Sequence, residues 1–116
     1  ESMSNHKVAI QTVTGLLLLR CSDILCFRFC SERHCWELIQ TDRTLHHLRN
    51  STTARELLGI SSEFAQTGQN FILNLNYLQH IENKTLRCTL HPPFQDLDIT
   101  ISRRYYGKIK ERLNII

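Results

Sequence analysis

Residues 97–113, LDITISRRYYGKIKERL, change halfway from the period of a strand to the period of a helix. Apolar side chains alternate with polar ones in Leu97-x-Ile99-x-Ile101, which is typical of a strand with one buried face. Ser102 is a residue type that caps helices, and beyond it the apolar residues recur at the spacing of one helix face. We therefore predict a strand that ends at Ile101 and a helix from about Arg103 to Leu113.

Upstream of this stretch, short strands dominate. Val8-x-Ile10-x-Thr12 alternates, Gly15 marks a turn, and Leu16 to Leu19 completes a hairpin. Runs rich in aliphatic and aromatic residues predict further strands at residues 23–29, 36–41, 44–48, 71–75, 77–81 and 86–90. Between them, Ser51 to Thr53 offers an N-cap, Glu56 lies close to the capping-box position and Gly59 is a stop signal. A short helix is predicted there.

The segment Phe64 to Asn70 is polar and contains Gly68, so we expect a loop. The resulting order of elements is mainly β and excludes alternating βαβ units, and the four glycines form no nucleotide-binding motif. No adjacent pair of helices is available for a helix-turn-helix. His34 and Cys35 are neighbours on a strand and face opposite sides, which excludes a nucleophile–base pair there. A non-enzymatic protein is predicted.

The chain has 116 residues, which suits a single domain. We assign residues 7–116 to it and interpret residues 1–6 as a tag remnant or the end of a linker. The net charge is +3, and five basic residues crowd the last helix against one acid. These are Arg103, Arg104, Lys108, Lys110 and Arg112. A basic surface suits a polyanionic partner.

Five cysteines, an odd number, favour a reducing compartment, and a cytoplasmic location is expected. Four of them fall between Cys21 and Cys35 with His34 among them, but the spacings contain no C-x2-C pair. Neither a metal nor a cofactor is therefore expected, although a small zinc protein remains an alternative. No apolar run is long enough to cross a membrane, and no membrane contact by this segment is predicted.

Two strings together carry a resemblance to a known family. Phe64-Ala-Gln-Thr-Gly-Gln-Asn-Phe-Ile-Leu-Asn74 and the later Ile101-Ser-Arg-Arg-Tyr-Tyr106 resemble the LytTR domain, which shows F-x-R-x-H-R-S-x-x-x-N and then a strand ending in S-R before a helix. The resemblance extends over roughly Lys7 to Leu113, with Asp23-Ile24 matching the start of a family strand. It implies about ten short, mostly antiparallel strands, a short middle helix and a C-terminal helix.

The resemblance also implies a function, which is sequence-specific binding of double-stranded DNA by loops in the major groove. The domain would be the output module of a bacterial transcription regulator, often in a two-component system. Binding as a homodimer on repeated sites, and an upstream receiver or sensor domain outside this chain, are further implications. The matching DNA-binding positions are Arg33, His34, Gln66, Gly68, Gln69, Asn70, Arg103 and Arg104, and Lys108 of the basic helix is added as a candidate phosphate contact. Arginine suits guanine, and glutamine or asparagine suits adenine.

The middle string departs from the family pattern. Gln66, Gly68, Gln69 and Asn70 stand where the family has Arg, His, Arg and Ser. The loop thereby loses its cations but keeps amides that can hydrogen-bond to bases. An alternative function follows, a β-rich protein-interaction or dimerisation module of the same fold with weakened DNA readout.

Overall fold

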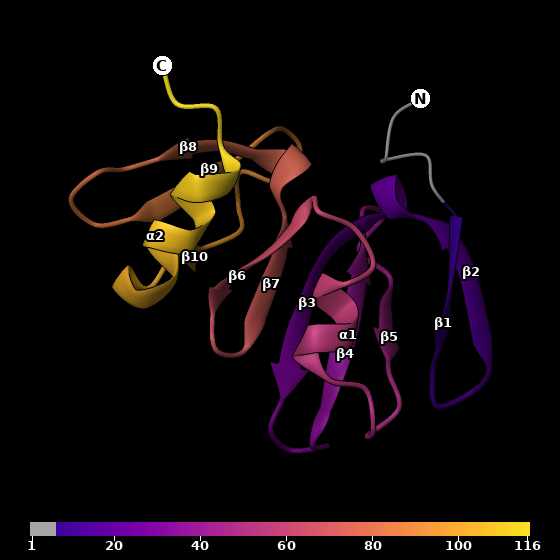
Figure 1. The fold of residues 1–116 in the computed structure, drawn as a ribbon. Helices are drawn as coiled ribbons and strands as arrows, with labels where there is room; N and C mark the ends of the chain where they lie inside the picture. The colour runs from indigo at the N-terminus through magenta and orange to yellow at the C-terminus, as the bar shows by residue number, and fades with distance from the viewer. Residues whose placement is uncertain (1–6) are drawn as a thin grey trace.

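A computed structural model describes residues 7–116 (Figure 1). Over this range the fold is mainly β, as predicted, with ten strands in three antiparallel sheets and two α-helices. The strands are β1 (Lys7–Gln11), β2 (Leu16–Arg20), β3 (Ile24–Cys30), β4 (Cys35–Gln40), β5 (Leu45–His47), β6 (Phe64–Gly68), β7 (Phe71–Asn74), β8 (Leu78–Ile81), β9 (Arg87–Leu90) and β10 (Ile99–Thr100). The helices are α1 (Ala54–Leu58) and α2 (Arg103–Arg112). The interpretation of residues 1–6 falls outside the described range.

A five-stranded sheet with the order β5-β4-β3-β7-β6 lies at the centre of the molecule. The β1-β2 hairpin and α1 pack on one of its faces, and the sheet β10-β9-β8 with α2 packs on the other (Figure 1). Successive residues of a strand point to opposite faces, so Phe27 enters the first core while Cys26 enters the second. Two separate apolar cores therefore share one sheet.

The short middle helix forms where its end signals predicted it. Thr53 is the N-cap, its hydroxyl accepts from the Glu56 N–H over 3.2 Å, and the Glu56 carboxylate accepts from the Thr53 N–H over 2.9 Å. This reciprocal capping box satisfies two otherwise unpaired backbone donors. Leu57 of this helix is 1% exposed and packs into the first core, where α1 contacts β6.

The prediction that residues 64–70 form a loop was wrong. Phe64–Gly68 is strand β6, paired antiparallel with β7. Its Phe64 is fully buried and its Thr67 is 2% exposed, because α1 and α2 both cover this edge strand. Tertiary packing therefore makes this polar segment a strand. Local sequence predicts strands poorly in such cases, because strand preference depends on the packing around the strand. A register shift between Gln66 and Gly68 places a bulge directly before the turn.

The strand expected from Leu97 to Ile101 is shorter than its alternation suggested. Only Ile99–Thr100 pairs with β9, and residues 95–96 form a turn. The polar residues of this stretch, Asp96 and Asp98, form ion pairs with Arg43 and Arg87 respectively. The following helix ends at Arg112, one residue before the predicted end.

Asn74, at the end of β7, is a structural residue. It is fully buried, and its Nδ2 donates to the C=O of Ile24 over 2.9 Å and of Cys21 over 3.3 Å. Its Oδ1 accepts from the Asn76 N–H over 3.1 Å. The side chain thus ties the end of β7 to the start of β3. None of the helices within residues 7–116 has the length and apolar character needed to cross a bilayer.

Candidate nucleic-acid interface

Three segments that are distant in the sequence follow one another along one edge of the molecule (Figure 1). The Phe29 N–H at the end of β3 donates to the Asn70 C=O in the β6–β7 turn, with 2.9 Å between N and O. The Ser102 N–H before α2 donates to the Thr67 C=O of β6 over 2.8 Å. We call this surface the basic edge, and it comprises residues 31–34, 66–70 and 102–108.

The β3–β4 turn presents Arg33 and His34, both exposed. His34 has a φ of 52°, in the left-handed region that non-glycine residues seldom adopt. The Asn50 Nδ2 donates to the C=O of Arg33 over 3.2 Å and to that of His34 over 3.4 Å. A side chain from the loop before α1 therefore holds the backbone of this turn in place.

The β6–β7 turn presents amides instead of cations. Gln69 and Asn70 are exposed at the tip of the turn, whereas Gln66 and Gly68 are half-buried. The Gln66 Nε2 lies 3.4 Å from the C=O of both Gly68 and Gln69, so this amide folds back on its own turn. A Cβ on Gly68 would meet nothing within 4 Å, which leaves open space beside the turn.

The start of α2 presents a cluster of cations around one aromatic ring. The Arg104 guanidinium carbon lies 5.6 Å from the centre of the Tyr105 ring, and the Lys108 Nζ lies 5.9 Å from the same ring. Arg103 is exposed in the first turn of the helix. The Ser102 side chain makes no capping hydrogen bond, although its backbone has the extended conformation of an N-cap. The first N–H groups of α2 thus lack the side-chain acceptor that its sequence predicted.

The charge of this edge is uncompensated. Within residues 7–116, Arg33, Arg103, Arg104 and Lys108 have no ion pair with a carboxylate. Cations in the first turn of a helix also oppose the helix dipole, so their placement does not stabilise α2. The edge can therefore attract an anion that the chain itself does not supply.

The structure brings all nine predicted DNA-binding positions to the basic edge, although Gln66 differs from the others in the direction of its amide. The sequence did not predict the structural roles of Asn50, which holds the first turn, and of Arg112, which it showed only as one of the basic residues of the last helix. The Arg112 Nη1 donates to the C=O of Ser62 over 3.2 Å and to the C=O of Phe64, and so joins the end of α2 to the start of β6. A hydrogen bond between a side chain and a distant carbonyl leaves no local signal in the sequence.

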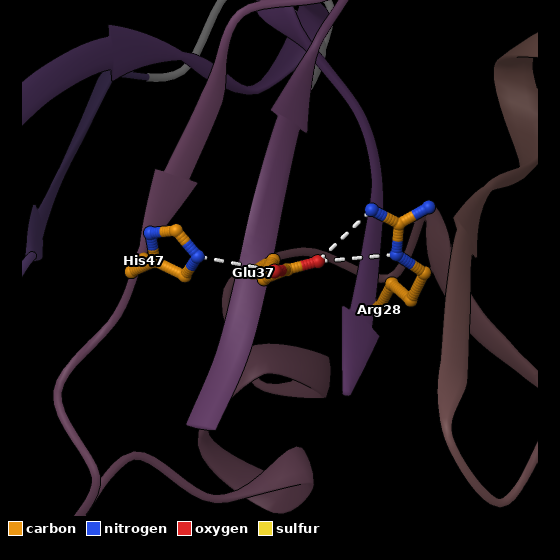
Figure 2. Close-up of polar contacts among 3 residues, drawn as sticks. All are labelled: Arg28, Glu37 and His47. Carbon is orange, nitrogen blue, oxygen red and sulfur yellow. Dashed lines mark hydrogen bonds and ion pairs between the residues drawn. The ribbon is translucent and has the colours of Figure 1, made fainter. Parts of the chain in front are cut away.

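A row of three charged or ionisable side chains, Arg28, Glu37 and His47, crosses the neighbouring strands β3, β4 and β5 (Figure 2). The Glu37 side chain is 8% exposed, and its Oε1 accepts from the Arg28 Nε over 3.1 Å and from Nη2 over 3.0 Å. Its Oε2 lies 3.1 Å from the His47 Nε2. The sequence held a sign of this row, because Glu37 lies in the middle of the mostly apolar strand CWELIQ. An acid is rarely buried without a partner, so a paired cation could have been expected.

The fold separates most of the cysteines, although Cys30 and Cys35 lie opposite each other at the end of the β3–β4 hairpin. Cys21 belongs to the first core, and Cys26 and Cys88 belong to the second. Burial raises the pKa of Cys26 to about 12 and that of Cys88 to about 11, so both thiols stay protonated near neutral pH. No group of three or more potential ligands from His, Cys, Asp and Glu forms in the described part of the chain.

The comparisons with known proteins concern the family and the fold. The family model of the LytTr DNA-binding domain matches residues 14–114. The chain belongs to the LytTR family. This LytTR domain also resembles a solved LytTr DNA-binding domain from Bacillus cereus, described as part of a methyl-accepting/DNA response regulator. The TM-score is 0.71 at 13% identity, over 94% of this chain and 97% of the other. At that identity the likeness establishes the fold alone. No curated protein is significantly similar in sequence.

Proposed function

We propose that this LytTR domain binds double-stranded DNA through the basic edge and reads base sequence there. The observation that carries the proposal is the alignment of three turns with uncompensated cations at two of them and free amides at the third. Two backbone hydrogen bonds hold the turns in a fixed order, so their side chains meet a ligand as one surface. Membership of a family of DNA-binding domains supports the same ligand.

Each turn has chemistry suited to a different part of the DNA. Arg104 and Arg103 can pair with guanine edges in the bidentate manner, and Gln69 and Asn70 can pair with adenine. Lys108, one helical turn beyond Arg104, suits a phosphate and would set register without reading sequence. Since the turns are separated along the edge, they would contact successive positions of the major groove.

The finer role is also a proposal. We infer that the domain is the output module of a bacterial transcription regulator, joined to a receiver or sensor domain and acting in the cytoplasm. Paired binding to repeated sites would double the contact area without a new surface on each domain. An analytical ultracentrifugation run with one-site and two-site duplexes tests the pairing, and a single bound copy on both duplexes would contradict it.

A second candidate function is supported by the β6–β7 turn. Because the Gln66 amide is turned back toward Gly68 and Gln69, it is less available to a base than the other amides. A module that keeps the fold and associates with another protein, with weak DNA readout, fits this feature. Under that function the domain has no preferred duplex.

Selection of bound sequences from random duplexes distinguishes the two functions. The DNA-reading function predicts enrichment of a motif with at least one guanine and one adenine position. The association function predicts an unenriched pool at every round. Arg43→Ala is a suitable control protein for the selection, because Arg43 carries the same charge at the opposite end of β4 and is paired with Asp96.

A further inference from the structure

The last residue pair of the β3–β4 hairpin consists of two cysteines. Cys30 and Cys35 are direct Cα partners, and the exposed turn that presents Arg33 and His34 lies between them. Both thiols are free. Cys35 is 3% exposed, whereas Cys30 is partly exposed to solvent. The pair therefore combines a partly exposed cysteine with a buried one.

The backbone geometry suits a bond between these sulfurs. The Phe29 N–H donates to Asn70 of the β6–β7 turn, and the Trp36 C=O accepts from Leu48, so Phe29 and Trp36 exchange no hydrogen bonds with each other. Alternation along the ladder makes Cys30 and Cys35 a hydrogen-bonded pair, in which Cα atoms lie about 5.5 Å apart. That separation falls within the range of about 4.4–6.8 Å seen across disulfides. Directly opposed residues also point to the same face of the sheet.

The electrostatics of Cys35 agree with this proximity. Burial raises the pKa of the Cys35 thiol, and the nearby Cys30 raises it further. The remaining cysteines offer no comparable pair with an accessible member, because Cys21, Cys26 and Cys88 are all buried in the cores. Oxidation that starts from solvent would therefore begin at Cys30.

We propose that Cys30 and Cys35 form a reversible thiol–disulfide couple that closes the base of the β3–β4 turn. With hydrogen peroxide as oxidant, the Cys30 sulfur attacks one peroxide oxygen, the O–O bond breaks, and a sulfenic acid and water form. The Cys35 sulfur then attacks the Cys30 sulfur, the S–S bond forms, and hydroxide leaves with the Cys35 proton as a second water. Two thiols are oxidised and one peroxide is reduced. A dithiol reductant reverses the reaction by exchange.

The bond would change the turn that it closes. Opposed Cβ atoms in a ladder lie about 4.5–5.5 Å apart, and a disulfide brings them to about 3.8 Å. The base of the turn must contract by about 1 Å, while the Asn50 side chain still holds the Arg33 and His34 carbonyls from outside. This consequence for the basic edge rests on the proposed function, whereas the couple itself does not.

Tryptic mapping under non-reducing conditions tests the couple directly. Trypsin cuts after Arg28, Arg33 and Arg43, so Cys30 and Cys35 fall on separate peptides, residues 29–33 and 34–43. After peroxide treatment and alkylation of free thiols, we expect these two peptides to be linked, and to separate with dithiothreitol. The Cys30→Ser variant should show no link at Cys35, and the half-exposed position of Cys30 makes loss of folding in this control unexpected.

Recovery of Cys30 as an alkylated thiol or a sulfinic acid, without the linked peptides, would overturn the proposal. A link from Cys30 to the peptide of Cys26 or Cys88 would overturn it as well. DNA affinity then tests the consequence separately, and we expect the oxidised domain to bind its preferred duplex about fivefold more weakly than the reduced one. Linked peptides in a domain that binds no duplex in either form would support the couple and contradict the proposed function.

Discussion

The arginines of the body of the domain and those of the basic edge are used in opposite ways. Arg43 makes a two-pronged pair with Asp96, with 2.7 and 2.8 Å between nitrogen and oxygen, and Arg87 pairs with Asp98 at 3.2 Å. Arg103 and Arg104 have no carboxylate partner within residues 7–116. Exposed pairs contribute little to stability, so the body could lose one at small cost. The unpaired cations are the ones whose removal should change function.

The largest expected effect is therefore at the start of α2. Arg104→Ala should cost about 1–3 kcal/mol of affinity on the preferred duplex and relax the preference at one base pair. Competition binding against duplexes that vary at a single position measures both changes. Arg43→Ala, which removes the same charge from the body, is the matched control and should leave the preference unchanged. Equal losses of DNA affinity in the two variants would contradict the distinction between arginines of the body and arginines of the basic edge.

The row formed by Arg28, Glu37 and His47 should affect the stability of the fold more than it affects DNA binding. Glu37→Gln removes the charge from a side chain that is 8% exposed and has hydrogen bonds from Arg28. We expect the free energy of unfolding to fall by roughly 1–2 kcal/mol, because hydrogen bonds to charged groups are stronger than neutral ones. Urea unfolding followed by circular dichroism measures the change. An unchanged midpoint would show that this row does not stabilise the hairpin.

Much of the fold follows from local patterns, and the elements that do not are instructive. Strict alternation or clear end signals predicted the first hairpin, α1 and α2 within a residue or two. Strand β6 was missed because its sequence, FAQTG, is polar and small, and what makes it a strand is the cover of two helices. The pairing of β3 with β7 brings together residues more than 40 positions apart, which no local period encodes.

The candidate site shows the same division. Resemblance to a family indicated which positions to consider, but the sequence held no sign that Phe29 and Asn70 join two of the turns. The sequence also did not distinguish Lys108 from Arg112. The Lys108 ammonium lies over the Tyr105 ring without a carboxylate partner, whereas Arg112 donates hydrogen bonds to backbone carbonyls. Basic residues on one helix look alike until the fold shows what lies opposite each of them.

A smaller effect should separate two glutamines of the β6–β7 turn. Gln69→Ala removes an exposed amide and should alter the preference at one base pair that differs from the position read by Arg104. Gln66→Ala removes an amide that contacts only its own turn, and should weaken all duplexes slightly and alike. The competition assay compares the two variants on the same duplexes. A change of preference with Gln66→Ala alone would reverse their assigned roles.

The smallest effect concerns the pH dependence of a body ion pair. The hydrogen bonds from Arg43 lower the pKa of the Asp96 carboxyl. A depressed folded-state pKa stabilises the fold above the unfolded pKa, and this contribution is lost as pH falls through the folded value. Carbon-detected NMR titration should show the pKa of Asp96 rising toward its ordinary value in Arg43→Ala, with DNA binding at neutral pH unaffected. An Asp96 titration curve that is the same in Arg43→Ala as in the unaltered domain would contradict the pairing of Arg43 with Asp96.

The salt dependence of binding tests the central claim most directly. If the basic edge meets about four to six phosphates, the logarithm of affinity for a duplex should fall with the logarithm of salt concentration at a slope near −4 to −5. Lys108→Ala should reduce the magnitude of that slope by about one, and Arg43→Ala should leave it unchanged. A slope near zero for the unaltered domain would show that the edge does not bind the DNA backbone, and would contradict the account.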